Sequence, residues 1–511
     1  MQERMTALES NCKIELVNVT KRFGKVIAND SVNLTIEGGK VLCLLGENGS
    51  GKTTLMNVLS GIYMPEQGHI LKNGVEIQIR SPKDAFANGI GMIHQHFKLV
   101  DVLTVTENII LGLNEKGKLN IRAAAQKIDD ICKKYGFGLD PMAKIYDLSV
   151  SQKQTVEIVK VLFRGAEILI LDEPTAVLTP QETDRLFQVV RNMRADGKAI
   201  VLITHKLHEV LSVSDEVAVL RKGKYIGTVK TSEATAQSLT DMMVGRAVSL
   251  NIDRPDPVDP KPRLKIEGLT CVDNLGVKRL DNVTFTAMSG EILGIAGIAG
   301  SGQRELLECI TGLYPVEHGT VTFLPEGKPA QQLIGKTPNQ IRKAGVAMAF
   351  VPEDRLGMGL VGSMGMGSNM MLRSWRKGKG AFVNRRDPNK LAMEVMEELE
   401  VVTPSISTPV RRLSGGNVQK VLVGREIAMS PSVLLTAYAV RGLDINTSYT
   451  IYNLLTQQKM KGSAVVFVGE DLDVLLELCD RILVLCGGKV SGIVDARTAT
   501  KEEIGLLMTK V

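Results

Sequence analysis

Short apolar runs of strand length, each followed by a helical pattern, recur along this chain. Val41–Leu45 and 292–295 are strand-like apolar segments, and a helical pattern such as 54–59 follows each of them after a glycine-rich loop. Later apolar runs at 168–171 and 200–204 are separated by further helical stretches. This alternation of strand, loop and helix predicts an α/β fold with a mostly parallel sheet, and it places a ligand site at the carboxyl ends of the strands.

The pattern of the first half is repeated in the second half. Gly46 aligns with Gly297 at an offset of 251, and Asp172 aligns with Ala437 at an offset of 265. The offset grows because the second copy carries two short insertions. The sequence therefore predicts a tandem duplication.

A proline-rich segment joins the two copies. Four prolines fall within eight positions, 255–262. Proline fixes φ and cannot sustain a helix, so this composition predicts a stiff, extended linker. We expect a first domain at 1–250, a linker at 251–262 and a second domain at 263–511.

The composition agrees with a reduced protein of more than one domain. The chain has 511 residues, which is too long for a single core, and its net charge of +6 does not by itself indicate a nucleic-acid partner. Seven cysteines without a pairing pattern predict free thiols, and Cys43 and Cys486 are expected to be buried. No signal region is found at the N-terminus, and no apolar run approaches the roughly 18 residues of a membrane span. If the protein acts at a membrane, other chains must supply the membrane part.

The loop after the first strand carries a phosphate-binding pattern. Residues 46–53 read G-E-N-G-S-G-K-T, which fits G-x-x-x-x-G-K-[ST]. Backbone N–H groups of such a loop wrap the phosphates, Lys52 would reach the β and γ oxygens, and the Thr53 hydroxyl would ligate Mg²⁺. The candidate nucleotide contacts here are Gly46, Asn48, Gly49, Ser50, Gly51, Lys52, Thr53 and Thr54.

Further candidates follow other apolar runs. Asp172 and Glu173 end the run that begins at 168, where Asp172 would hold Mg²⁺ and Glu173 would act as general base on the attacking water. His205 is either a contact of the γ-phosphate or a structural histidine. Gln95 would bind metal or water through its amide. Phe23 is either a platform for adenine or a core aromatic residue.

The segments 148–152 and 413–417 complete the set, and each precedes a predicted helix. Residues 413–417 read L-S-G-G-N, and this sequence strongly resembles the L-S-G-G-Q signature of the ATP-binding-cassette (ABC) ATPases. The resemblance covers both halves and uses six motifs in the same order. It implies two P-loop ABC ATPase domains, each with a RecA-like, mostly parallel sheet, an antiparallel β subdomain and a helical subdomain. It also implies ATP and Mg²⁺ as cofactors.

In that family two cassettes pair head to tail, so each ATP site joins one phosphate loop to the signature of the other lobe. The resemblance thus implies one complete site, in which Ser414, Gly415, Gly416 and Asp444 face the first phosphate loop. The second lobe has lost its own set, through Asn274 for Phe23, Gln303 for Lys52, Arg304 for Thr53, Glu353 for Gln95, Ala437 for Asp172, Tyr438 for Glu173 and Glu470 for His205.

The first lobe has changed only where it would face the second site. Val150 and Ser151 replace the signature glycines, and Thr179 stands at the place of Asp444. Neutral erosion of a redundant half does not explain why 413–417 and 441–444 remain intact within it. We therefore predict one hydrolytic site and one degenerate site.

Within the family, the chain resembles the ATPase subunits of bacterial carbohydrate-type importers, and above all their nucleoside branch. Residues 300–306 read G-S-G-Q-R-E-L, and Ala437 and Tyr438 replace the second pair of carboxylates, as is typical of that branch. The tripeptide 438–440 departs even from that branch, which leaves the geometry of this strand end open. A ribose- or galactose-type importer is the alternative. A soluble tandem cassette acting on ribosomes or DNA is disfavoured by the short proline-rich joint and the degenerate site.

The resemblance implies a place at the cytoplasmic face of a bacterial cell membrane. The partners would be two integral-membrane permease subunits and, indirectly, an extracytoplasmic substrate-binding protein, with no nucleic acid. The segments 97–110 and 356–371 are candidates for the permease contact, with the core of a helical subdomain as the alternative. The basic run 373–379 is either a solvated face or a contact for RNA or anionic lipid.

Overall fold

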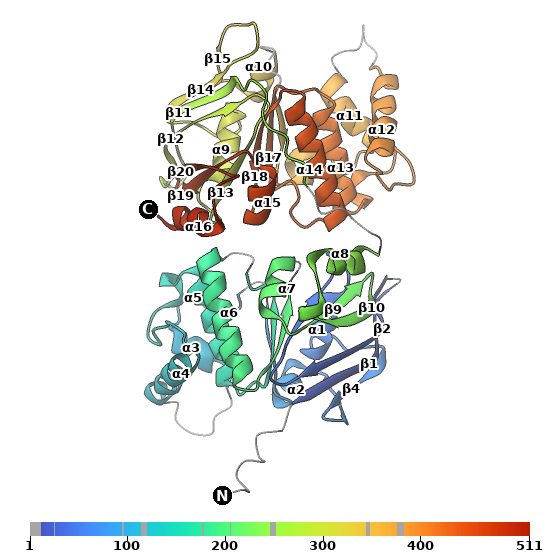
Figure 1. Cartoon of the computed structure of the whole chain (residues 1–511), viewed down its shortest axis with the longest axis vertical. Helices are drawn as coiled ribbons and strands as arrows, with labels where there is room; N and C mark the ends of the chain where they lie inside the picture. The colour runs from blue at the N-terminus through green and yellow to red at the C-terminus, as the bar shows by residue number, and fades with distance from the viewer. Residues whose placement is uncertain are drawn as a thin grey trace, which may run out of the picture. The chain divides into compact units, whose positions relative to one another are not determined.

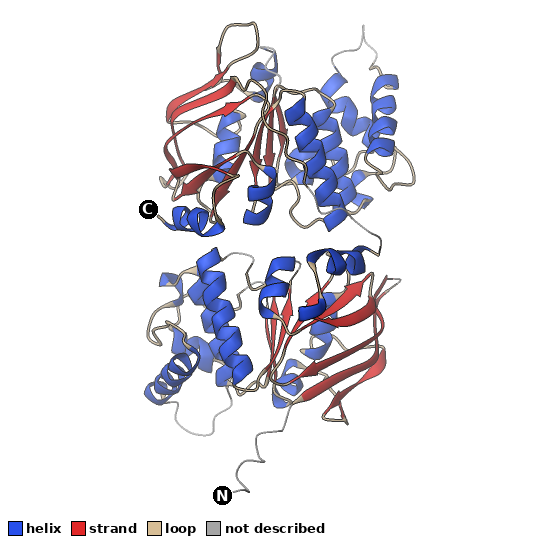
Figure 2. Cartoon of the chain, viewed as in Figure 1, coloured by secondary structure: helices blue, strands red, loops and turns tan. Residues whose placement is uncertain are grey.

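The computed structural model describes residues 12–24, 26–94, 97–113, 120–175, 178–204, 206–245, 252–343, 348–375 and 383–510. The chain forms two compact units, Met1–Ser249 and Leu250–Val511. Each unit holds a six-stranded sheet, a four-stranded sheet and a set of helices (Figures 1 and 2).

The first unit is built around a sheet whose central strand leads to the phosphate loop. The six strands lie in the order β10 (Lys224–Lys230), β9 (Glu216–Arg221), β3 (Val41–Leu45), β8 (Ala199–Ile203), β7 (Ile168–Asp172) and β6 (Ile90–Ile93). Only the β9–β10 pair is antiparallel. The four-stranded antiparallel sheet has the order β2 (Val26–Glu37), β1 (Lys13–Phe23), β4 (Gln67–Lys72) and β5 (Val75–Ile77).

The helices of the first unit cover the sheet and form a separate helical part. The described helices are α1 (Lys52–Leu59), α2 (Pro82–Ala87), α3 (Val105–Ile110), α4 (Ile121–Tyr135), α5 (Val150–Phe163), α6 (Pro180–Ala195), α7 (Leu207–Val213) and α8 (Ala236–Val244), with short 3₁₀ turns η1 (Ile145–Asp147) and η2 (Thr231–Glu233). In Figure 1 the helices α3, α4 and α5 lie at one side of this unit and the antiparallel sheet lies at the other. The buried residues Val105, Ile109, Ile128 and Val156 give these helices a core of their own.

The second unit repeats the strand order of the first. Its six-stranded sheet runs β16 (Met348–Val351), β17 (Val433–Ala437), β18 (Ala464–Val468), β13 (Ile292–Gly297), β19 (Arg481–Cys486) and β20 (Lys489–Asp495), and only β19 and β20 are antiparallel. Its four-stranded antiparallel sheet runs β12 (Lys278–Met288), β11 (Pro262–Val272), β14 (His318–Phe323) and β15 (Gln331–Gln332).

The second unit also repeats the arrangement of helices. They are α9 (Gln303–Ile310), α10 (Pro338–Lys343), the π-helical turn η3 (Arg355–Gly359), α11 (Met366–Ser374), α12 (Arg386–Glu398), the 3₁₀ turn η5 (Val410–Arg412), α13 (Gly415–Ile427), α14 (Ile445–Met460), α15 (Leu472–Leu478) and α16 (Lys501–Thr509). The predicted α/β class, with a parallel sheet, an antiparallel sheet and a helical part in each copy, is therefore confirmed.

The predicted burial of the strands and cysteines is also observed. All residues of β3 and β7 are buried, as expected for parallel strands covered on both faces. All seven cysteines are free and buried, so the expected reduced thiols are found inside the units. No helix within the described residues is long and apolar enough to cross a membrane.

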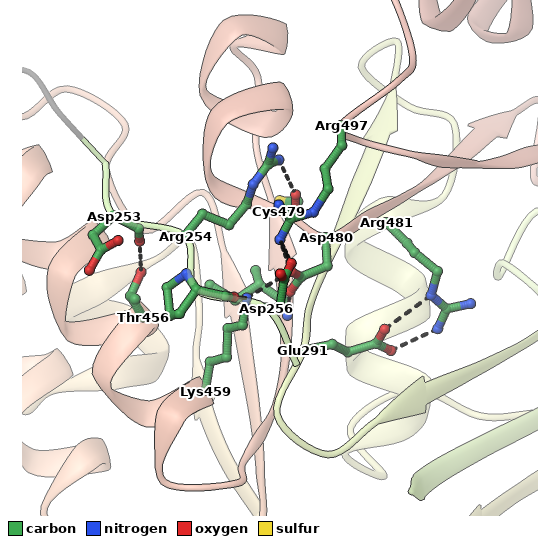
Figure 3. A network of polar contacts seen from close by, with 12 residues as sticks. Asp253, Arg254, Asp256, Glu291, Thr456, Lys459, Cys479, Asp480, Arg481 and Arg497 are labelled. Atoms are coloured by element: carbon green, nitrogen blue, oxygen red, sulfur yellow. Dashed lines mark hydrogen bonds and ion pairs between the residues drawn. The ribbon is translucent and has the colours of Figure 1, made fainter. Parts of the chain in front are cut away.

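The first part of the predicted linker is packed against the second unit, which the sequence did not indicate. We call residues 252–256 the strap. Ile252 is buried in the core of the second unit, and Arg254 donates hydrogen bonds of 2.7 Å to the carbonyls of Leu476 and Cys479 (Figure 3). Extended backbone leaves its carbonyl groups free to accept, and those of Asp253 and Pro255 accept from α14.

A buried ion pair lies beneath the strap. Lys459 Nζ lies 2.7 Å from Asp480 Oδ1 and 2.6 Å from the carbonyl oxygen of Pro255, and the Lys459 side chain is only 2% exposed. Asp480 also accepts from the backbone N–H of Ile292, the first residue of β13. The first unit has a matching but more exposed pair, since Arg194 lies 2.6 Å from Asp215 and its side chain is 44% exposed.

This difference predicts unequal effects of two matched substitutions. Lys459→Met should lower the free energy of unfolding of the second unit by about 3 kcal/mol, because it leaves the buried Asp480 carboxylate with only the more distant Arg497 guanidinium, 3.8 Å away. Arg194→Met should cost less than about 1 kcal/mol, as is typical of an exposed pair. Trp375 is the only tryptophan and lies in the second unit, so its fluorescence during urea unfolding reports the effect of Lys459→Met. Circular dichroism follows the unfolding of both units and reports the effect of Arg194→Met. Equal losses from the two variants would contradict this account of the strap.

Candidate functional site

The phosphate loop of the first unit connects β3 to α1. Its glycines adopt left-handed backbone conformations, with φ of 81° at Gly49 and 98° at Gly51. Lys52 Nζ donates to the carbonyl oxygens of Gly46 at 2.6 Å and Glu47 at 3.1 Å. Burial lowers the pKa of Lys52, while the neighbouring Glu173 and Asp172 oppose this shift. The ammonium is therefore held inside the loop, next to both strand-end carboxylates.

The carboxylates reach the same place from β7. Asp172 is the last residue of that strand and accepts a hydrogen bond from the Thr53 hydroxyl, and burial raises the pKa of Asp172 to about 6. Glu173 follows with φ of 47°, a strained value for a residue with a side chain, and its N–H donates to the Ile203 carbonyl. Functional sites are where such strain and such pKa shifts cluster.

A small cavity of about 130 Å³ lies among these groups. It is lined by Asn48, Gly49, Gly51, Lys52, Thr53, Thr54 and Glu173. The structure thus brings together the phosphate-loop residues and the Glu173 carboxylate, which are more than 100 positions apart in the sequence.

The oxygen atoms at this site suit a magnesium ion that takes its other ligands from water and from a bound phosphate. Among the described residues, no group of three or more His, Cys, Asp or Glu side chains could hold a metal ion. The hydrogen-bonded pair of the Thr53 hydroxyl and the Asp172 carboxylate instead offers two hard oxygens. Mg²⁺ commonly keeps several waters and takes its remaining ligands from a phosphate, so two protein oxygens are sufficient.

Three predicted residues lie elsewhere or outside the described chain. Phe23 ends β1, is 45% exposed and packs edge-on against Tyr63 with ring centroids 5.1 Å apart. It is not a core residue, and it is not among the residues that line the cavity. Gln95 and His205 lie outside the described residues.

The loop of the second unit has the same backbone but different side chains. Gly300 and Gly302 have φ of 88° and 98°, close to the values in the first unit. The Gln303 amide donates to the Ile298 carbonyl at 3.1 Å, where Lys52 makes the matching contact with Glu47. Arg304 pairs with Glu308 on the same helix at 2.7 Å. The second loop therefore keeps its shape without the lysine or the threonine.

The end of β17 in the second unit has the same backbone geometry as the end of β7 in the first unit. The unusual tripeptide 438–440, for which the sequence left this geometry open, has therefore not changed it. Tyr438 has φ of 50°, and its N–H donates to the Val468 carbonyl at 3.1 Å, as Glu173 does to Ile203. Burial raises the pKa of the Tyr438 hydroxyl to about 12, so this group stays neutral at physiological pH.

The signature segments form matched helix N-termini. The Ser149 hydroxyl caps α5 by accepting from the Gln152 N–H at 3.3 Å, and the Ser414 hydroxyl caps α13 by accepting from the Asn417 N–H at 3.4 Å. Gly415 opens α13, so backbone N–H groups and the positive end of the helix dipole lie at Ser414, Gly415 and Gly416.

Asp444 and Thr179 have a structural role that sequence reasoning missed. Asp444 caps α14 through the Thr447 N–H at 2.8 Å, and Thr179 caps α6 through the Glu182 N–H at 3.3 Å. Aspartate or threonine directly before a helix is a common N-cap signal, and it could have been found in the sequence. The exchange of Asp444 for Thr179 changes the charge of the loop and leaves the cap in place.

Taken together, these features describe tandem nucleotide-binding units of the P-loop type. The first unit has the lysine of the loop and the two strand-end carboxylates, and the second unit lacks all three. The profile of the family described as "ABC transporter" matches residues 29–176 and 280–436, one stretch in each unit. This chain belongs to the ABC transporter family. The match confirms the predicted family, ATP as the ligand and ATP-driven transport as the class of activity.

Curated relatives match along almost the whole chain. The nucleoside import ATP-binding protein NupA of Lactococcus lactis subsp. cremoris is 42% identical over 501 residues, which cover 97% of each chain. The guanosine import ATP-binding protein NupO of Bacillus subtilis is 42% identical over 500 residues, again 97% of each. The ribose import ATP-binding protein RbsA 1 of Rubrobacter xylanophilus is 37% identical over 501 residues, 97% of this chain and 98% of the relative.

The raised pKa of Asp172 predicts a pH-dependent stability. A carboxyl whose pKa rises from 3.8 to about 6 on folding destabilises the folded state as the pH rises above 3.8, and the full effect is reached above pH 6, because folding then buries a charge. Asp172→Asn should therefore stabilise the nucleotide-free first unit at pH 8 by on the order of 3 kcal/mol, and by roughly half as much at pH 5.

Chemical denaturation of the nucleotide-free chain at the two pH values measures this effect. Asp184→Asn, on the exposed face of α6, is the matched control and should shift the stability by less than about 0.5 kcal/mol at either pH. A stabilisation by Asp172→Asn that is equal at pH 5 and pH 8 would mean that the Asp172 charge is not the cause.

Proposed function

We propose that this chain is the ATP-hydrolysing subunit that energises the import of nucleosides through a membrane transporter. The observation that carries the proposal is the complete set of phosphate-loop and strand-end groups around the cavity of the first unit. Nucleosides are supported as substrates by the printed names of two relatives that are 42% identical over 97% of this chain. A relative named for ribose import, at 37% identity, makes a monosaccharide importer the second candidate.

Each residue of the first unit has a proposed role in hydrolysis. Lys52 and the backbone N–H groups of the loop hold the β and γ phosphate oxygens, and Thr53 and Asp172, with Gln95, hold Mg²⁺, which neutralises phosphate charge when bound. Glu173 takes a proton from the water whose oxygen attacks the γ-phosphorus, and the bond from that phosphorus to the β,γ-bridging oxygen breaks, so that ADP leaves. His205 contacts the γ-phosphate, and the exposed ring of Phe23 stacks on adenine.

The working site is shared with the second unit in this proposal. Ser414, Gly415 and Gly416 present the N-terminus of α13 to the γ-phosphate that is bound by the first loop, with Asp444 beside them. Support comes from the intact 413–417 and 441–444 segments in a unit that has lost its own lysine, threonine and both strand-end carboxylates. A helix N-terminus with free N–H groups is a ready anion site.

Two permease subunits at the cytoplasmic face of the membrane are the proposed partners, with an extracytoplasmic binding protein acting through them. Leu356, Met358, Val361 and Met364 are all more than 35% exposed in the second unit. A groove of about 430 Å³ lies beside them, and its lining includes Leu313, Phe350, Pro352, Met358, Arg373 and Arg425. Such an exposed apolar surface suits a protein contact.

Other parts of the candidate permease segments are buried in the units. Val105 and Ile109 of α3 belong to the helical core of the first unit, and Met366 and Met370 of α11 are buried in the second. Arg373, at the start of the basic run, forms an ion pair with the buried Glu426 at 2.7 Å, and residues 376–379 lie outside the described residues.

Glu173→Gln should lower the rate of ATP turnover by about 10²–10⁴-fold, because it removes the general base. The affinity for ATP should change by no more than a few-fold, since the phosphate loop is untouched. Steady-state phosphate release and equilibrium nucleotide binding measure the two effects. Tyr438→Phe, at the equivalent place in the second unit, should leave turnover within about twofold. Turnover near the wild-type rate in Glu173→Gln would refute the role of this residue.

Ser414→Arg should block hydrolysis in the assembled transporter, although Ser414 lies far in sequence from every catalytic side chain of the first unit. The added side chain would fill the space that the γ-phosphate needs at the helix N-terminus. Ser149→Arg is the matched control, because it faces the degenerate loop and should be much milder. Equal damage, or the opposite ranking, would mean that the units do not share a site in this way.

Deletion of the gene should confer resistance to toxic nucleoside analogues and leave growth on ribose or galactose unchanged. Uptake of labelled nucleosides should fall in the same strain and return with a plasmid copy. The reverse phenotype, with loss of growth on a sugar and unchanged sensitivity to the analogues, would favour the monosaccharide importer.

A further inference from the structure

Three positions around the degenerate strand end carry charges that their counterparts in the first unit lack. Glu353 stands for Gln95, and Glu470 stands for His205. The offset of 265 that pairs Asp172 with Ala437 also pairs Ala176 with Arg441. The second unit thus carries two negative charges and one positive charge at positions whose counterparts in the first unit are Gln95, His205 and Ala176.

The structure joins these three charges into one cluster. Arg441 Nη1 lies 2.5 Å from Glu353 Oε1, and Arg441 Nε lies 3.2 Å from Glu470 Oε1. The guanidinium carbon also lies 5.9 Å from the centroid of the Tyr438 ring, which stands in the place of the general base. Independent erosion of three positions gives no reason for the new charges to pair with each other.

The cluster does not serve mainly to stabilise the fold. The side chains of Arg441, Glu353 and Glu470 are 56%, 40% and 47% exposed. Ion pairs this exposed contribute little to the free energy of unfolding. A planar guanidinium held by carboxylates on two sides is, however, fixed in orientation, which a lysine could not reproduce. The cluster is therefore suited to holding a loop in one position.

The loop that Arg441 belongs to leads directly to Asp444. The Arg441 N–H donates to the Tyr438 carbonyl and the Leu443 N–H donates to the Val440 carbonyl, each at 3.1 Å. These tight turns pass from the end of β17 to Asp444, which caps α14. A shift of Arg441 would consequently be transmitted over three residues to the aspartate.

The side chain of Arg355 connects the 441–444 loop to the signature segment 413–417. One of its terminal nitrogens donates to the Arg441 carbonyl. The other lies 3.3 Å from the place that a Cβ atom on Gly415 would occupy. Burial lowers the pKa of Arg355, in agreement with its half-buried position between the two segments. The Arg355 guanidinium thus lies between the 441–444 loop and the start of α13.

We propose that Arg441 is a positioning residue, which the carboxylates of Glu353 and Glu470 hold so that Asp444 and the signature N-terminus are presented to the ATP bound by the first unit. The inference rests on the proposed sharing of the hydrolytic site. In this account the second unit has replaced its phosphate-binding groups by the ion-paired cluster of Glu353, Arg441 and Glu470. We call this cluster the brace, and it positions residues of the hydrolytic site.

Steady-state ATPase kinetics of the assembled transporter test the proposal. Arg441→Ala should lower kcat by about tenfold and leave KM for ATP within about twofold, because displacing reacting groups by about 1 Å is enough to cost up to 10²-fold. Arg304→Ala is the matched control, since Arg304 is also an exposed, ion-paired arginine of the degenerate site, and it should leave kcat within about twofold.

A double-mutant cycle separates the brace from a general loss of structure. Glu470→Gln should lower kcat by itself, but the double variant with Arg441→Ala should match Arg441→Ala alone within about twofold. Arg441→Lys keeps the charge but not the planar, forked guanidinium, and its kcat should fall by roughly threefold or more. This variant provides the test if Arg441→Ala does not fold. Additive losses in the cycle, or a wild-type kcat in Arg441→Lys, would overturn the proposal.

The same assay distinguishes this inference from the proposed function on which it rests. If Ser414→Arg is inactive and Arg441→Ala has a wild-type kcat, the shared site stands and the brace is refuted. If Ser414→Arg remains fully active, the shared site itself is refuted.

Discussion

The close approach of the phosphate loop to the antiparallel sheet is the constraint on which both units depend. A Cβ atom on Gly51 would lie 2.3 Å from the carbonyl oxygen of Ala28 on β2, and one on Gly302 would lie 2.5 Å from that of Arg279 on β12. Both glycines have φ of 98°, which other residues rarely adopt. The glycines of the degenerate loop are therefore required by the fold, and their retention does not depend on a bound nucleotide.

At the strand ends, too, the backbone conformation is the same in both units although the side chains differ. Glu173 and Tyr438 share a left-handed conformation that costs on the order of 1–3 kcal/mol, although only one of them is a carboxylate. The strain thus belongs to the turn that leads from the strand to the next helix. The electrostatic cost, by contrast, is confined to the first unit, where Asp172 is buried with a pKa of about 6 and its counterpart is Ala437. The second unit has kept the framework and lost the buried charge.

Much of this arrangement could be predicted because it depends on local patterns. Apolar runs, glycine spacing and the two-step offset were sufficient for the parallel sheets, the phosphate loop and the duplication. The antiparallel sheets and the helical parts were implied only by the family resemblance. The strap was not predictable, since its contacts join Asp253 and Arg254 to residues more than 200 positions away. The cluster around Arg441 left a signal that the sequence reading did not use, namely three new charges at aligned positions. The roles of Gln95 and His205, and the sharing of a site between the units, remain predictions.

The central claim is that one phosphate loop hydrolyses ATP and that its equally shaped counterpart does not. Matched alanine substitutions at the equivalent loop positions test it most directly, with Mg²⁺-dependent ATP hydrolysis of the assembled transporter as the measurement. The account predicts that Lys52→Ala abolishes hydrolysis, because the loop loses its only cation for the β and γ oxygens, and that Gln303→Ala keeps the rate within a few-fold of wild type. Hydrolysis that persists in Lys52→Ala would contradict the account.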